Sequence, residues 1–237
     1  MLKNKKPLFS IITVVLNNRK YLEKTIKSVL SQNNKDFEYI IVDGGSTDGT
    51  LQIINRYKKK ITKIVSKKDK GIYDAFNKGM KLANGEYICI VNSDDRLKIN
   101  ALKIINKYID KYPKADFFFG SVKKHWGVLH GYRPEKIKYS WGFYSSHSTG
   151  FYLKRSSAKK IGFYDIKYKY HADYDYFYRM IVKKKMKGFA TKKHEVVGIF
   201  RRGGFSSTIP YRKMFVEELK IRYNNGQSII LLLILGI

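Results

Sequence analysis

The first half of the chain alternates short apolar segments with amphipathic ones, and this alternation restricts the possible folds severely. The apolar segments are short and rich in β-branched residues, as buried strands are, and the segments between them repeat apolar residues at helical spacing. We expect strands at 9–16, 39–43, 61–65 and 87–92, and helices at about 21–31, 50–58, 72–82 and 100–111. Strands that alternate with helices predict an α/β fold: a Rossmann-like, mostly parallel sheet with right-handed crossovers, flanked by helices.

Beyond Pro113 the sequence is less regular and more aromatic. Phe117-Phe-Phe-Gly-Ser-Val122 and an aromatic stretch at 125–152 precede a predicted helix at about 173–185 and a predicted strand at 196–200. Aromatic side chains at this density both fill a core and form platforms for sugar rings or bases.

No repeat or linker divides the chain, so we predict one continuous domain over residues 1–210. Its first half, up to about residue 112, is predicted to bind a nucleotide, and a less regular second half runs from about 113 to 210. Residues 211–237 are predicted to form a basic amphipathic helix and an apolar tail.

Two of the predicted strands deliver acidic residues to their carboxyl ends, where open α/β sheets bind ligands. One reads Tyr87-Ile-Cys-Ile-Val-Asn-Ser-Asp94-Asp95, and the other reads Phe37-Glu-Tyr-Ile-Ile-Val-Asp43-Gly-Gly-Ser-Thr-Asp48-Gly. Adjacent carboxylates repel unless a cation or a sugar hydroxyl lies between them. The alternative is that Asp95 only caps the helix that starts near Asn100.

Several enzyme classes lack their signature here. The chain has no Gly-x-x-x-x-Gly-Lys-Ser/Thr loop, and no Gly-x-Gly-x-x-Gly follows the first strand. What remains is a set of acids spread over the predicted strand and helix ends: Asp43, Asp74, Asp94, Asp95 and Asp173. A basic protein that keeps such acids in a cleft is expected to hold a divalent metal and a nucleotide sugar.

The charge of the chain is its compositional outlier. With 48 basic and 19 acidic residues, the net charge is +29. Such an excess predicts an anionic partner, which is nucleic acid, acidic lipid or a phosphate-bearing substrate. Nucleic-acid binding is therefore an alternative function, although the acid cluster argues against it, and we expect no nucleic-acid partner.

The chain ends in a run of apolar residues, Ser228-Ile-Ile-Leu-Leu-Leu-Ile-Leu-Gly-Ile237. The run is too short to span a bilayer, which takes about 20 residues. Two interpretations stay open: the run lies in the membrane interface with the basic stretch 211–223 above it, or it packs on the domain or on another subunit. We expect a cytoplasmic protein, peripheral on the inner face of the membrane if the first interpretation holds.

A resemblance emerges when the motifs are taken in order. They are Ser10-Ile-Ile-Thr-Val-Val-Leu-Asn17, the Asp43 to Thr50 turn, Asp69-Lys-Gly-Ile-Tyr-Asp74-Ala-Phe-Asn77-Lys-Gly79, Asn92-Ser-Asp94-Asp95, His147-Ser-Thr-Gly-Phe151, Ala172-Asp173-Tyr-Asp175 and Arg202-Gly-Gly-Phe-Ser206. Together they resemble the inverting family 2 glycosyltransferases of the GT-A fold, especially the bacterial surface-polysaccharide branch. The resemblance implies transfer of a sugar from a nucleotide, UDP by expectation, to a glycan or lipid-linked glycan acceptor, with Mn²⁺ or Mg²⁺ as cofactor. An inactive transferase-like scaffold is a further alternative, against which the intact acids argue.

The resemblance implies that the half from about residue 113 binds the acceptor and carries the catalytic group, and it also implies roles for single residues. Val14 and Asn17 would line the nucleotide end, and Asp43 would accept a hydrogen bond from the base. The donor or its diphosphate would contact Asp74, Asp94, His147 and Arg202, with Asp94 at the ribose. Asp95 would bind the metal. Asp173 would be the catalytic base, in an Ala-Asp pair where most members have Glu-Asp.

Overall fold

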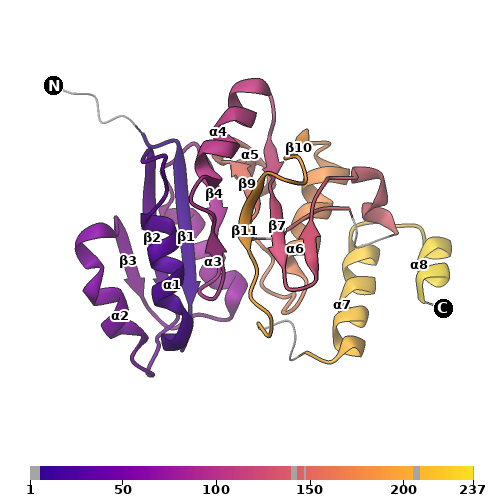
Figure 1. The fold of residues 1–237 in the computed structure, drawn as a ribbon. Coiled ribbons are helices and arrows are strands. Elements are labelled where there is room, and N and C mark those ends of the chain that lie inside the picture. The colour runs from indigo at the N-terminus through magenta and orange to yellow at the C-terminus, as the bar shows by residue number, and fades with distance from the viewer. Residues whose placement is uncertain (1–5, 140–142, 147, 205–208, 237) are drawn as a thin grey trace.

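The computed structural model describes residues 6–139, 143–146, 148–204 and 209–236 (Figure 1). Within these ranges the main sheet has seven strands in the spatial order β10-β6-β9-β4-β1-β2-β3. They are β1 Phe9–Val15, β2 Phe37–Asp43, β3 Lys63–Ser66, β4 Tyr87–Ile90, β6 Phe117–Phe119, β9 Phe151–Lys154 and β10 Gly188–Ala190. Strands β3, β2, β1 and β4 run parallel, β9 is antiparallel to both neighbours, and β10 is parallel to β6. The predicted fold class is confirmed.

Helices cover both faces of this sheet (Figure 1). They are α1 Arg19–Leu30, α2 Thr50–Arg56, α3 Ile72–Leu82, α4 Ala101–Lys111, α5 Arg155–Ile161, α6 Ala172–Tyr178, α7 Tyr211–Asn224 and α8 Ile229–Gly236. Because successive side chains of a strand point to opposite faces, β1 serves two cores. Ile11 and Val15 pack in the core with α1, α2 and α4, and Ile12 and Val14 pack in the core with α3, α5 and α6.

A second, four-stranded sheet has the order β5-β11-β7-β8, with β5 Arg96–Leu97, β11 Val196–Ile199, β7 Ser121–Lys124 and β8 Gly127–Leu129. The aromatic segment at 117–122 contributes to two strands, β6 in the main sheet and β7 in the small one. The chain passes from one sheet to the other at Gly120. No side chain fits there, because a Cβ at this position would lie 2.2 Å from a methyl carbon of Val197. Since β11 is paired antiparallel with β5, the residues that follow Ile199 return toward Asp94 and Asp95.

The C-terminal helices form one end of the molecule in Figure 1. Helix α7 contributes Ile221 to the core shared by α3, α5 and α6. The division at residues 112 and 210 stays a prediction. In the part of the chain that the structure describes, no helix combines the length and the apolar character needed to cross a bilayer.

Candidate active site

The carboxyl ends of β1 and β2 are joined by Asn17. Its backbone has a left-handed φ of 48°, which Asn tolerates better than most residues. Its N–H donates to Ser46 Oγ at 2.8 Å, and its side-chain Oδ1 accepts from the Thr47 N–H at 2.8 Å. Asn17 thus fixes the turn after β2. Val14, also predicted to lie at the nucleotide end, is 5% exposed and packs in the core.

Asp43 lies at the end of β2, level with Val15 of β1 and Ser66 of β3. The residue has no exposed surface. Its carboxylate accepts hydrogen bonds from the Gly45 N–H at 3.0 Å, the Ser46 N–H at 3.1 Å and Ser66 Oγ at 2.7 Å. The carboxylate therefore builds the turn itself, and its contact with a base stays a prediction.

A second carboxylate, which the sequence analysis missed, lies beside this turn. Gly44 leaves room for Asp69, because a Cβ at Gly44 would lie 2.3 Å from Asp69 Oδ2 and 3.4 Å from a Leu16 methyl carbon. Asp69 Oδ1 accepts from the Gly71 N–H at 3.0 Å, and Leu16 is 54% exposed. The signal for Asp69 was present in the Asp69-Lys-Gly71 turn, but only the fold brings it to Gly44.

Asp74 stands in the first turn of α3 and holds the loop before it. Its Oδ2 accepts from the Lys70 N–H at 3.0 Å and lies 3.2 Å from Lys78 Nζ. Although partial burial opposes ionisation, the Lys70 N–H and the Lys78 ammonium lower the pKa of Asp74. The side chain is therefore a stable anion at neutral pH.

Asp95 is buried behind the sheet end, with 2% of its surface exposed. One carboxylate oxygen accepts from the Arg201 N–H at 3.0 Å and the other from the Thr149 hydroxyl at 3.0 Å. Burial, followed by the charge of Asp94, raises the pKa of Asp95 to about 7. Asp95 thus ties the end of β4 to the segment after β11.

Asp94 is the more accessible of the pair, with a side chain 17% exposed. Arg201 Nε and Nη2 each lie 3.1 Å from Asp94 Oδ2, and the guanidinium lies over the Tyr21 ring, 4.1 Å from its centroid. These three residues line a cavity of about 220 Å³. The structure thus places Arg201 against these carboxylates, whereas the predicted Arg202 is exposed.

The residues present fit a divalent metal that shares its shell with a ligand. No group of three His, Cys, Asp or Glu side chains that could hold an ion occurs among the described residues. Asp94 and Asp95 supply only oxygen atoms, which suit Mg²⁺ or Mn²⁺. Most of the shell would therefore come from diphosphate and water, and Asp94 is the more exposed of the two carboxylates.

Asp173 lies in the first turn of α6, 7% exposed. Its Oδ1 accepts from Tyr73 Oη at 3.1 Å and from the Tyr174 N–H at 2.9 Å. Burial, followed by the charge of Asp173, raises the pKa of Tyr73 well above its ordinary value, so the phenol stays protonated and donates. Tyr73 belongs to α3, which also carries Asp74. One helix therefore holds the loop at Lys70 and contacts Asp173.

Two further residues belong to the motifs of the second half, His147 and Asp175. His147 lies outside the described residues. Asp175 points away from Asp173 and binds Arg179 Nε at 2.8 Å and Asn225 Nδ2 at 2.9 Å. These contacts tie α6 to the residue that follows α7.

Comparison with known proteins identifies the class. The model of glycosyl transferase family 2 matches residues 10–171. This covers more than half of the chain, so the protein belongs to that family and is a glycosyltransferase.

Two curated relatives are similar in sequence. The PGL/p-HBAD biosynthesis glycosyltransferase of Mycobacterium bovis (strain BCG / Pasteur 1173P2) is 29% identical over 96% of this chain and 90% of its own length. The putative teichuronic acid biosynthesis glycosyltransferase TuaG of Bacillus subtilis is 41% identical over 42% of this chain and 41% of its own length.

Solved structures share the fold. S. aureus TarS 1–349 in complex with UDP superposes with a TM-score of 0.72 at 21% identity, over 91% of this chain. The mannosyltransferase PcManGT of Pyrobaculum calidifontis, in complex with GDP-Man and Mn²⁺, gives 0.64 at 16% identity, over 94% of this chain. The present chain spans 64% of the length of either of these solved chains.

Proposed function

We propose that the protein is a metal-dependent, inverting glycosyltransferase that moves a sugar from a UDP-linked donor to a glycan acceptor in cell-surface polysaccharide synthesis. The observation that carries the proposal is the Asp94 carboxylate, half of a charged pair with Arg201 at the sheet end, within a family 2 fold. The relatives named for teichuronic acid and PGL/p-HBAD biosynthesis support a role in cell-surface polysaccharide synthesis. The UDP bound to TarS supports UDP as the nucleotide of the donor.

The metal proposal rests on the paired acids and on the Mn²⁺ in PcManGT. A bound Mn²⁺ or Mg²⁺ supplies Lewis-acid stabilisation of the departing diphosphate. Asp94, rather than the buried Asp95, would present the exposed oxygen, and Asp95 would hold Arg201 behind it. This division changes the sequence prediction, in which Asp95 bound the metal and Asp94 the ribose.

The remaining residues would divide the reaction between binding and proton transfer. Arg201 has a guanidinium able to pair with phosphate oxygens once it leaves Asp94, because guanidinium binds phosphate in a bidentate way. Asp173 would take the acceptor hydroxyl proton as that oxygen attacks the anomeric carbon from the face opposite the diphosphate, which inverts the configuration. Whether one nucleoside diphosphate binds only with metal tests the proposal.

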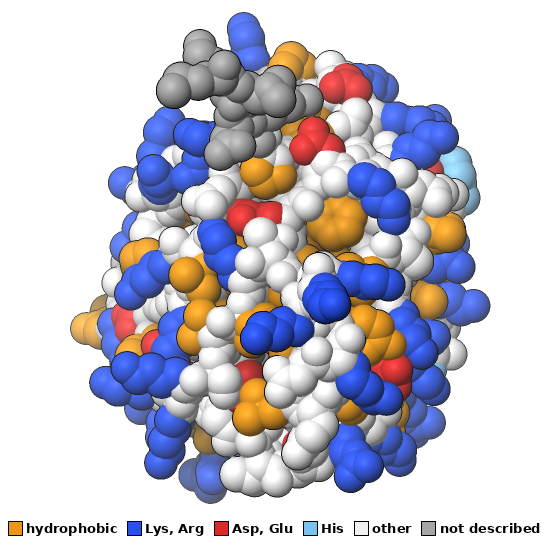
Figure 2. Space-filling view, turned by 90° about the vertical axis from the view of Figure 1, so that its left-hand side faces the viewer, with side chains coloured by type: hydrophobic (Ala, Val, Ile, Leu, Met, Phe, Trp, Pro, Cys, Tyr) orange, Lys and Arg blue, Asp and Glu red, His pale blue; other side chains and the backbone are white. Residues whose placement is uncertain are grey.

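Nucleic-acid binding has less support. Figure 2 shows Lys and Arg side chains spread over the outline of one face, with Asp and Glu side chains between them and no single basic band. A polyanion track concentrates its charge on one face or along one groove.

We also propose that α8 contacts an anionic membrane. Its exposed apolar side chains lie one helical turn apart: Ile229, Ile230, Leu233 and Ile234, each 62–72% exposed. The neighbouring helix α7 adds the exposed cations Arg212, Lys213 and Lys220. A second copy of the chain carries the same +29 and repels the first, whereas anionic lipid attracts it, so charge favours lipid as the partner.

The membrane proposal makes a direct prediction. We expect the protein to sediment with vesicles of phosphatidylglycerol and phosphatidylcholine, and less with phosphatidylcholine alone. The double variant Ile230→Asp, Leu233→Asp should bind at least about tenfold more weakly, because two apolar side chains no longer enter the interface. Ile99→Asp, at an apolar residue 52% exposed elsewhere, is the control and should bind as the wild type does. Equal sedimentation of the double variant, or its change only from dimer to monomer, would contradict the proposal.

A further inference from the structure

Helix α7 grips the segment that leads into α6. The Glu217 carboxylate accepts three consecutive backbone N–H groups, from Lys169 at 2.8 Å, Tyr170 at 2.7 Å and His171 at 2.8 Å. These residues end two positions before Asp173. Backbone donors that meet a carboxylate form charge-assisted hydrogen bonds, which are shorter and stronger than neutral ones. Glu217 therefore fixes the path of the chain just where it enters the helix of the proposed base.

The gripping helix is itself held firmly. Arg222 is 2% exposed and donates from Nε to Glu218 Oε1 at 2.8 Å, and its Nη1 also donates to the Lys138 carbonyl. Ile221 packs in the core beside these residues. Because α7 is held in this way, the Glu217 carboxylate holds the backbone of residues 169–171 at a fixed place relative to α7.

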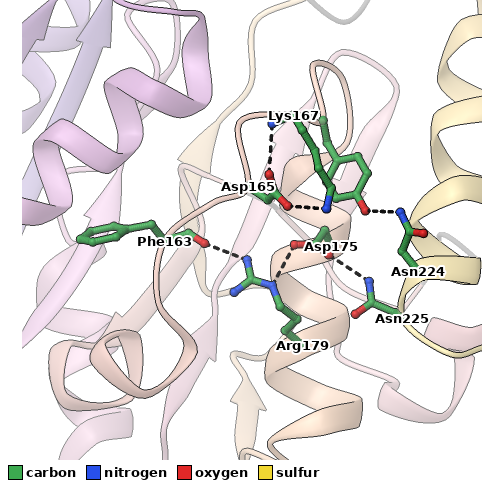
Figure 3. Close-up of a pocket in the computed structure, with 8 residues that line it drawn as sticks. Phe163, Asp165, Lys167, Asp175, Arg179, Asn224 and Asn225 are labelled. Atoms are coloured by element: carbon green, nitrogen blue, oxygen red, sulfur yellow. Dashed lines mark hydrogen bonds and ion pairs between the residues drawn. The ribbon is translucent and has the colours of Figure 1, made fainter.

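The other end of α7 holds the same segment. Figure 3 shows a cavity of about 450 Å³ between the loop at 163–168, α6 and the end of α7. Asn224 Nδ2 donates to Tyr168 Oη at 2.9 Å, and Asn225 Nδ2 donates to Asp175 Oδ1 at 2.9 Å. The charges in this cavity are paired with each other, Asp165 with Lys167 and Asp175 with Arg179, each at 2.8 Å. The cavity is therefore a brace between helices, and α7 fixes the chain on both sides of Asp173.

We propose that Glu217 is a positioning residue for sugar transfer. By holding the 169–171 backbone, it sets the orientation of the Asp173 carboxylate. The inference rests on the proposed role of Asp173 as base. Glu217, like Asp173, lies beyond the stretch that matches the family model, which ends at residue 171. Because misplacing a reacting group by about 1 Å can cost about 10²-fold in rate, the loss of this grip should slow transfer without affecting the donor site.

The test compares Glu217→Ala and Glu217→Gln with Val216→Ala, at an exposed residue of the same helix. We expect Glu217→Ala to lower kcat about 10- to 100-fold, with the Kd for the metal–UDP complex within about twofold of the wild type. Glu217→Gln should recover part of the loss, because its amide oxygen can still accept from Tyr170 and His171. Val216→Ala should behave as the wild type does.

A second measurement separates this inference from the proposed function. Amide hydrogen exchange should be faster at residues 169–173 in Glu217→Ala and unchanged in the main sheet, whether or not a substrate is known. Unchanged exchange there, unchanged kcat, or equal losses in kcat and UDP affinity would overturn the positioning role. If the wild type itself transfers no sugar while exchange responds as expected, the proposed function fails and the grip on the 169–171 backbone stands.

Discussion

We expect Asp173→Asn to lower the rate of sugar transfer by about 10² to 10⁴-fold, which is the usual contribution of a general base. The amide is nearly the same size and can still accept from Tyr73 Oη and the Tyr174 N–H, so the local structure should persist. It cannot take a proton from the acceptor hydroxyl. The Kd for the metal–UDP complex should therefore stay within about twofold of the wild-type value, as calorimetry would measure it.

Asp110→Asn is the matched control, because Asp110 is an exposed acid of α4 that takes no part in the site or in the brace. It should leave the transfer rate within about twofold of the wild type. Transfer by Asp173→Asn at the wild-type rate would remove Asp173 from the role of base. A parallel loss of UDP affinity would instead make Asp173 part of the donor site.

The second large effect is expected at Asp94. Asp94→Ala should weaken binding of UDP in the presence of Mn²⁺ by at least about 30-fold, because the proposed metal loses its carboxylate partner. Losing one partner of a buried charge pair costs about 2 kcal/mol or more. Affinity measured with EDTA should change little, since only the metal-dependent part is lost. Arg201, released from its 3.1 Å contacts with Asp94, would still be able to pair with phosphate oxygens.

Asp110→Ala provides the control at Asp94, since Asp110 is an exposed acid of α4. Its UDP affinity with Mn²⁺ should equal that of the wild type. Were Asp94→Ala to bind the metal–UDP complex as tightly as the control, the metal would have to be held elsewhere.

The sequence predicted the parts of the fold that depend on local patterns. Helix α3 was expected at about 72–82 and spans Ile72–Leu82, because its apolar spacing and preceding glycine mark both face and start. The alternation of strands and helices likewise predicted a mostly parallel sheet, and strands β3, β2, β1 and β4 do run parallel. Such features depend on residues that are close in the chain, and they can therefore be predicted from a single sequence.

The place of β11 in the small sheet could not be predicted, because β11 pairs with β7 and β5, which lie about 75 and 100 residues earlier in the chain. That pairing decides the contacts of the site. It brings Arg201, and not the adjacent Arg202, against Asp94, and one residue of register separates the two outcomes. Glu217 was missed for the same reason, since its three partners lie more than 45 residues away.

The most direct test of the central claim is calorimetric titration of the wild-type protein with UDP, GDP, CDP and TDP, each with Mn²⁺ and with EDTA. We predict binding of UDP with Mn²⁺, weaker or absent binding with EDTA, and no comparable response to the other three diphosphates. The same titration with a DNA duplex over a range of salt concentrations measures the competing explanation of the +29 charge. No response to any diphosphate, together with steeply salt-dependent DNA binding, would contradict the assignment as a nucleotide-sugar transferase.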